Sequence, residues 1–251
     1  MATAFEASPL MADTEAALRR DLAACFRLCA LHGWDDHIAT HMSARLPDGS
    51  FLLNPFGLLF EEITASNLMR VDLEGNVIAP PGHPMNPAAF TIHSAVLGGR
   101  PDVGCVIHLH TRDGAAVSAL EEGLLPMTQT ALQVHCDVAY HEYEGVADHL
   151  DERERLQADL GGHNVMILRN HGTLTTGASV GAAFYRMMTL EFACSAQVRA
   201  LGMGRPVRMA PQDVQDAMPA MIEKLGESFI DYAFWPAMLR KAQRDCPGFD
   251  A

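Results

Sequence analysis

The chain is 251 residues long, 49% apolar and 20% charged, and it carries a formal net charge of −13 at neutral pH. This length buries a core within one large domain or two small ones, and the composition is typical of a soluble globular protein. The negative charge argues against nucleic acid and anionic membranes as partners, because both need clustered Lys and Arg. No apolar run reaches the roughly 18 residues of a membrane span.

The amino terminus and the cysteines indicate a cytoplasmic protein. The first residues become acidic before any apolar run, which is not the pattern of a signal peptide. The six cysteines contain no C-x-x-C pair and are expected to be reduced. We therefore expect a cytoplasmic chain without a membrane partner.

Residues 1–12 are predicted to be a flexible lead, and residues 13–251 a single domain with a helical tail. Asp13 is expected to cap a helix that ends at Gly33, because the apolar positions between them follow helical spacing. The first regular element is therefore an amphipathic helix.

Short elements follow this helix. Strands are predicted over residues 51–54 and 69–72, with a small helix begun by Thr64 between them. The turn at 74–76 leads into another extended piece, and the loop over 80–87 is rich in Pro and Gly. This region therefore contributes strands rather than long helices.

From residue 87 onward, helical and extended patterns alternate. Helices are predicted over 87–96, 111–120, 151–160, 179–201, 211–225 and 227–243, buried strands over 103–108 and 165–168, and an extended piece over 137–140. Pro87 suits a first helical turn, and Ser179 is a favoured capping residue. Alternation of this kind is typical of an α/β layered domain.

Three histidines stand where two of these strands end. His108 and His110 are two residues apart, so both imidazoles point to the same face of a strand. His171 follows another apolar run and precedes Gly172, which allows a sharp turn. Twelve histidines make roughly half an H-x-H pair expected by chance, so a hydrogen-bonded core histidine is the alternative for each. Together the three predict a divalent-metal site with an open coordination position.

Several motifs occur in the order found in a known family. They are NPFGLLFEEIT at 54–64, FTIHSA at 90–95, RPDV at 100–103, HLH at 108–110 and LRNHG at 168–172. With these motifs the chain closely resembles the class II aldolase/adducin family. The segments DLEGN at 72–76, GAAVS at 114–118 and QVR at 197–199 resemble its adducin-head branch. The resemblance implies a three-layer α/β/α sandwich with a mixed central sheet, and a homotetramer with active sites between subunits. It also implies zinc on His108, His110 and His171.

The chain departs from the family's sugar-phosphate aldolases at positions that carry chemistry. Pro87-Ala88-Ala89 stands where those enzymes have Ser-Ser-Glu, so Ala89 replaces the glutamate that serves as general acid/base. Thr40-His41 replaces a Gly-Asn pair, and Phe56-Gly57 a Ser-Gly pair, both of which help to hold the substrate phosphate. Because Phe and Ala side chains cannot bind a phosphate, the resemblance does not imply an ordinary sugar-phosphate substrate.

Proton transfer then needs another group with a tunable pKa. His41 is the first candidate, and His141 with Tyr140 and Tyr143 is the second; a capping histidine and an edge-strand surface are the alternatives. Glu191 is expected to be an interface or solvated carboxylate within a long helix. If Phe56, Phe60 or Phe90 lines the cleft, and is not core packing, the substrate is less polar than a sugar phosphate.

Three functions remain open. The first is a metal-dependent lyase, by aldol cleavage or decarboxylation, on a non-phosphorylated hydroxy-carbonyl compound with Zn²⁺, Fe²⁺ or Mn²⁺. The second is a non-haem Fe²⁺ oxygenase of an aromatic or keto acid, since imidazole suits iron as well as zinc. The third is a non-catalytic binding protein, as in the adducins. The first is favoured, with a small molecule as its partner.

Overall fold

The computed structural model describes residues 14–80 and 82–251. The predicted lead over 1–12 and the predicted capping residue Asp13 lie outside this part of the chain. The strands are β1 His41–Arg45, β2 Phe51–Leu53, β3 Met69–Val71, β4 Val77–Ala79, β5 Cys105–Leu109, β6 Val138–His141, β7 Val165–Leu168 and β8 Gly172–Gly177. They form one sheet in the order β4-β3-β2-β1-β5-β8-β7-β6.

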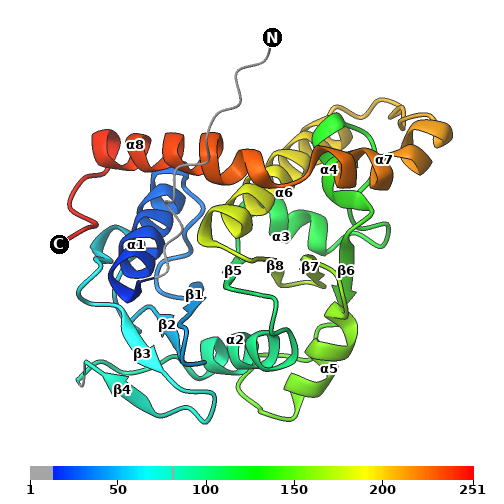
Figure 1. Cartoon of the computed structure of the whole chain (residues 1–251). Coiled ribbons are helices and arrows are strands. Elements are labelled where there is room, and N and C mark those ends of the chain that lie inside the picture. The colour runs from blue at the N-terminus through cyan, green and yellow to red at the C-terminus, as the bar shows by residue number, and fades with distance from the viewer. Residues whose placement is uncertain (1–13, 81) are drawn as a thin grey trace.

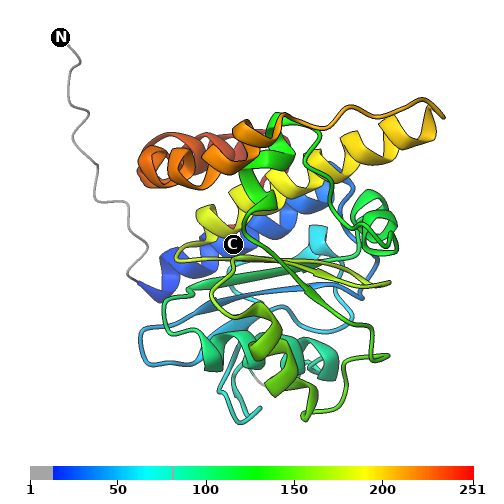
Figure 2. The same cartoon turned by 90° about the vertical axis from the view of Figure 1, so that its right-hand side faces the viewer.

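Helices cover both faces of this sheet, as Figures 1 and 2 show. The helices are α1 Glu15–His32, α2 Pro87–Gly99, α3 Arg112–Ser118, α4 Gln129–His135, α5 Glu152–Leu160, α6 Val180–Gly202, α7 Gln212–Leu225 and α8 Trp235–Asp245. Short turns lie at η1 Phe60–Glu62 and at the π-helical η2 Ile230–Phe234. In Figure 2, α2 and α5 lie on one side of the sheet and α1, α6 and α8 on the other.

The sheet is mixed, because β6 and β7 are parallel whereas the other neighbouring strands run antiparallel. Alternation along β1 sends Met42 and Ala44 into the core beneath α1 and α6, and turns His41 and Ser43 toward α2. On β5 likewise, Ile107 faces this same core beneath α1 and α6, while Val106 packs on the opposite face of the sheet in a second core with α2 and α5. His108 therefore shares the α2 face with His41.

Local signals explain where α1 and α6 begin and end. Thr14 accepts a hydrogen bond from the backbone N–H of Ala17 and takes the capping position, one residue after Asp13. Gly33 ends α1 in the left-handed region at a φ of 68°, as the sequence indicates. Ser179 caps α6 by accepting from the N–H of Ala182.

Several elements differ from the sequence-based expectation. A single 3-10 turn, η1, precedes Thr64 in place of a helix begun there, and the side chain of Asn67 closes the following turn by accepting from the N–H of Thr64. The predicted helix over 227–243 is divided, since the π turn η2 leads into α8 at Trp235. Pro236 has no N–H to donate, which suits the first turn of a helix, so the α-helical hydrogen bonds of α8 begin at this point.

Three elements, β1, β8 and α4, were not predicted from the sequence. The segments HMSAR and GTLTTG lack a long apolar run, although both strands are buried in the middle of the sheet. Their position beside β5 decides the neighbours of His108. None of the helices in the described part of the chain combines the length and the apolar character that a membrane crossing requires.

Candidate metal centre and its cleft

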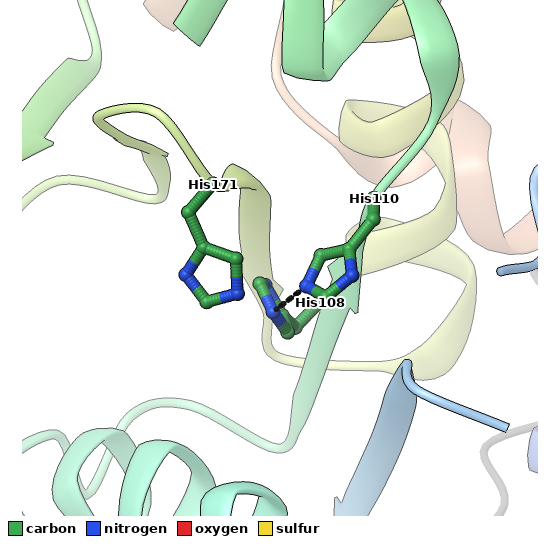
Figure 3. A group of neighbouring side chains, drawn as sticks. All are labelled: His108, His110 and His171. Carbon is green, nitrogen blue, oxygen red and sulfur yellow. Dashed lines mark hydrogen bonds between the residues drawn. The ribbon is translucent and has the colours of Figure 1, made fainter. Parts of the chain in front are cut away.

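His108, His110 and His171 come together at one end of β5, and we refer to them as the histidine trio. His108 lies on β5, His110 directly follows its last residue, and His171 lies in the turn between β7 and β8. The antiparallel register pairs Leu109 with Thr173, which brings that turn to the end of β5. One ring nitrogen from each member lies within 4.8 Å of the others, and Figure 3 shows the rings converging.

The turn that carries His171 depends on its backbone conformation. Asn170 adopts a left-handed φ of 54°, and the N–H of His171 donates to the carbonyl of Leu168 at 3.1 Å. A β-carbon on Gly172 would lie 2.4 Å from the carbonyl oxygen of Leu109 and 3.0 Å from Cδ2 of His110. Glycine is therefore required here by the close approach of β8 to β5.

We expect Gly172→Ala to destabilise the protein by about 1–3 kcal/mol, as overpacked sites do, and to displace His110. Urea unfolding measures the loss. Gly162→Ala is the matched control, because a β-carbon there meets no atom within 4 Å. Equal stability of the two variants would show that β5 and β8 separate without strain.

Two partners fix the ring orientations in the trio. Nδ1 of His108 donates to the carbonyl oxygen of Thr173 at 3.0 Å, and Nδ1 of His110 lies 3.1 Å from a carboxylate oxygen of Asp36. With both Nδ1 protons engaged in this way, the two Nε2 lone pairs face each other across 3.0 Å (Figure 3). Facing lone pairs repel unless a cation lies between them, so this donor set fits a divalent metal.

The protonation of the trio agrees with such a site. Burial, followed by the neighbouring His171, lowers the pKa of His108 well below its usual value. Burial, followed by His110, lowers the pKa of His171 to about 4. Metal ligands must be neutral imidazoles, and these two are neutral at physiological pH.

The trio opens into a cleft of about 420 Å³. Its lining residues are Ile38, Ala39, His41, Phe56, Asn86, Ala88, Ile92, His108, His110, Tyr143, Gly145, Val146, Ala147 and His171. Of the three phenylalanines considered from the sequence, Phe56 lines the cleft. Phe60 packs in the core beneath α1 and α6, and Phe90 packs in the core with α2 and α5. No Lys, Arg, Asp or Glu is among these lining residues, so the walls are largely apolar.

His41 lies in this cleft beside the trio. The sheet register places it directly opposite His108, and the two ring centroids are 5.0 Å apart. Its Nδ1 lies 2.8 Å from Nε2 of His93, whose Nδ1 lies 2.5 Å from the hydroxyl of Ser43. Burial lowers the pKa of His41 well below its ordinary value and that of His93 to about 3. The structure thus adds His93, which lies on the mainly apolar helix α2, to the residues behind the cleft.

Comparison with known proteins identifies the family. Residues 20–198 match the family described as Class II Aldolase and Adducin N-terminal domain. The chain belongs to this family. An aldolase II superfamily protein from Pseudomonas syringae is 46% identical and superimposes with a TM-score of 0.88 over 97% of both chains. The family resemblance and the α/β/α fold expected from the motifs are confirmed.

Two further relatives mark the range of the family. The L-fuculose 1-phosphate aldolase from Glaciozyma antarctica PI12 is 28% identical, with a TM-score of 0.80 over 97% of this chain and 94% of that one. Alpha-adducin of Mus musculus is 45% identical over 192 residues, which cover 74% of this chain but 26% of the adducin. The chain is therefore similar both to an aldolase and to about a quarter of a much longer adducin.

Residues 87–89, where the sequence resemblance led us to expect the family's acid/base residue, contain no carboxylate. Pro87 and Ala88 form the first turn of α2, where Ala88 lines the cleft and Ala89 is buried in the core against the sheet. Asp36 is the carboxylate that bonds to the trio, and it does so from behind His110. Among the residues that line the cleft, histidines and Tyr143 are the side chains that can exchange a proton.

Within the chain, His141 and Tyr140 lie outside this cleft, so the sequence-based proposal that they take part in proton transfer gains no support from their placement. His141 ends β6 facing α5, where its Nδ1 lies 2.7 Å from Asp159 and its Nε2 3.4 Å from Glu152. Tyr140 points to the opposite face by strand alternation, and its hydroxyl accepts from the N–H of Leu124 at 3.0 Å. Of the predicted cluster, Tyr143 lines the cleft, with its ring 6.2 Å from that of His171.

Glu191 also differs from its expected role. It was expected at an interface or in solvent, but its side chain is buried between α6 and β8 and accepts from the hydroxyl of Thr173 at 3.5 Å. Burial raises its pKa to about 7. The residue therefore supports the strand that carries the carbonyl partner of His108.

Proposed function

We propose that this chain is a divalent-metal-dependent lyase that cleaves a carbon–carbon bond, by aldol cleavage or decarboxylation, in a non-phosphorylated hydroxy-carbonyl compound. The observation that carries the proposal is the histidine trio, whose paired Nε2 atoms lie 3.0 Å apart at the wall of an open cleft. Three imidazoles with one free position are typical of catalytic zinc, although iron and manganese also accept such ligands.

Each group has a distinct part in this proposal. The trio would hold the ion, which would supply Lewis-acid polarisation of a substrate carbonyl. Asp36 and the carbonyl of Thr173 hold the rings of His110 and His108 with their Nε2 atoms inward. His41 faces the substrate from β1, opposite His108.

The cleft supports a substrate without a phosphate. A phosphate dianion is bound by Arg, Lys, hydroxyls or a series of backbone N–H groups. In the cleft, Phe56 and Ala88 stand at two positions where the sequence comparison expected hydroxyls, and the lining residues include no cation. An uncharged chain next to the hydroxy-carbonyl group fits these walls better.

A metal and oxygen screen tests the proposed reaction. The protein, purified without chelators, is analysed for bound metal and then assayed with short hydroxy-carbonyl acids and aldols under argon and in air. We expect anaerobic turnover supported by Zn²⁺ or Mn²⁺. Strict dependence on iron and oxygen would favour the oxygenase instead. A protein that binds no metal would favour the non-catalytic binding role suggested by the likeness to adducin.

Replacing Asp36 by alanine tests the site without touching a ligand. Loss of a carboxylate that orients a metal-bound histidine costs about 10–100-fold in metal affinity, and we expect zinc binding to weaken by that factor. Competition with a chromogenic chelator measures it. Asp35→Ala is the matched control, because among the described residues Asp35 makes no side-chain hydrogen bond. Equal affinities for the two variants would place the metal elsewhere.

We also propose that the chain assembles as a homotetramer with its sites at subunit interfaces. The support is membership of the class II aldolase family, whose members are often homotetramers. Light scattering coupled to size-exclusion chromatography tests this, and a monomer would contradict it. In such an assembly, the exposed Tyr143 and Val146 at the cleft rim would be the residues to examine next.

A further inference from the structure

A line of three buried polar side chains leads from the cleft into the protein. It runs from His41 through His93 to Ser43, with nitrogen–nitrogen and nitrogen–oxygen separations of 2.8 and 2.5 Å. His41 and Ser43 lie on the same face of β1, and His93 on α2 bridges them. All three side chains are buried. The direction of these two hydrogen bonds decides what His41 presents to a ligand.

Ser43 fixes that direction. Its hydroxyl has one hydrogen-bond partner in the part of the chain that the structure describes, namely Nδ1 of His93. A buried hydroxyl proton needs an acceptor, and Nδ1 of His93 is the acceptor within reach. Ser43 therefore donates, so Nδ1 of His93 carries no proton.

The proton of His93 must then be on Nε2, and it is donated to Nδ1 of His41. Because Nδ1 of His41 accepts this hydrogen bond and a neutral imidazole carries one N–H, the proton of His41 is on its own Nε2. Over the described ranges, the buried side-chain atoms without a partner belong to His32, Thr40 and Asn54. Nε2 of His41 has no hydrogen-bond partner among the described residues and yet is not one of these buried atoms. It is therefore exposed to the cleft that this residue lines.

Other arrangements leave a buried group unsatisfied. If the line ran in the opposite direction, or if His93 were an imidazolium, Ser43 would accept from His93 and its own hydroxyl proton would have no acceptor among the described residues. Loss of one buried hydrogen bond disfavours such a state on the order of tenfold or more. The observed line therefore selects one tautomer of His41.

We propose that His41 presents an N–H to the cleft and donates it to a substrate oxygen that carries or gains negative charge. Ser43 and His93 are positioning residues that hold this tautomer. His41 is thus a hydrogen-bond donor and not the base that removes a proton, because its lone pair is engaged by His93. The substrate class this fits has a carboxylate or carbonyl oxygen next to the group held by the trio. The choice of oxygen rests on the proposed lyase function, whereas the tautomer does not.

Neutron diffraction from deuterium-exchanged crystals tests the tautomer without any assay. We expect deuterium on Oγ of Ser43 directed at His93, on Nε2 of His93 and on Nε2 of His41. Deuterium on Nδ1 of His41, with its Nε2 bare, would overturn the proposal. This result stands even if the protein binds no metal.

Two variants test the donor role, with oxalate as the probe and calorimetry on the zinc-loaded protein. His41→Gln keeps an N–H donor and should bind oxalate within about threefold of the unchanged protein. His41→Leu has none, and should bind about tenfold more weakly, as expected for loss of one hydrogen bond to an anion. Zinc content should be equal in both. If His41→Leu binds oxalate as well as His41→Gln does, His41 is not a donor. Loss of zinc from the unchanged protein would instead count against the metal site.

Discussion

Replacing His108 by alanine is expected to abolish stoichiometric zinc binding and all lyase turnover. His108 is the buried member of the histidine trio, and its Nε2 lies 3.0 Å from that of His110 and its ring centroid 4.8 Å from that of His171. Two remaining imidazoles cannot hold the ion, so affinity should fall by more than the roughly 100-fold that loss of an orienting partner costs. Metal analysis after dialysis measures the effect.

His163→Ala is the control for this experiment. His163 is a half-exposed histidine beside Asp137, on the loop before β7 and away from the cleft. We expect it to retain one zinc per chain and full activity. A His108→Ala protein that also kept one zinc would show that the metal lies outside the trio. Circular dichroism of both variants separates loss of the site from loss of the fold.

The metal-free protein is expected to lose stability steeply between pH 6.5 and pH 5. Burial lowers the pKa of His93 to about 3, and lowers those of His41 and His108 in the same direction. In the unfolded chain these histidines bind protons near the ordinary pKa of 6.5. Between the two pKa values the unfolded state binds more protons, so the free energy of unfolding falls as the pH falls.

The size of this effect follows from the same values. At pH 5, His93 alone contributes about 2 kcal/mol of destabilisation, because the pH lies roughly 1.5 units below its unfolded pKa. Glu191 acts in the opposite direction: its raised pKa of about 7 lets the folded state bind a proton first, which offsets about one histidine. The three buried histidines together outweigh Glu191, so the free energy of unfolding still falls as the pH falls.

Urea unfolding of the chelator-treated protein at a series of pH values checks this prediction. His93→Gln should flatten the dependence by about one proton, because it removes one buried group that titrates only in the unfolded chain. A free energy of unfolding that stayed constant between pH 7 and pH 5 would contradict the prediction. Saturating zinc should raise stability most at high pH, where the ligands are neutral.

The sequence by itself predicted the trio because each part of that prediction is local. His108 and His110 share a strand face through the period of two, and the glycine after His171 marks a turn. The order of the family motifs added the fold and the strand ends. These signals need no knowledge of which strands are neighbours, and the structure brings the three residues together as expected.

Tertiary structure alone decided the groups around the trio. Asp36 reaches His110 across 74 positions of sequence, and Thr173 reaches His108 across 65. His93 meets His41 because β1 lies beside β5 and α2 covers that face, and β1 itself has no apolar run to reveal it. Strand register and helix placement set these contacts, and no local spacing contains them.

The same reason explains why Tyr140, His141 and Glu191 lie elsewhere than their local sequence suggested. Sequence proximity grouped Tyr140 with His141, but strand alternation sends their side chains to opposite faces, and α5 occupies His141 with carboxylates. Glu191 was expected at an interface or in solvent from its place within a long helix, but β8 covers its side chain. Local spacing says which residues share a face; the packing of sheet and helices decides whether that face meets the cleft, the core or solvent.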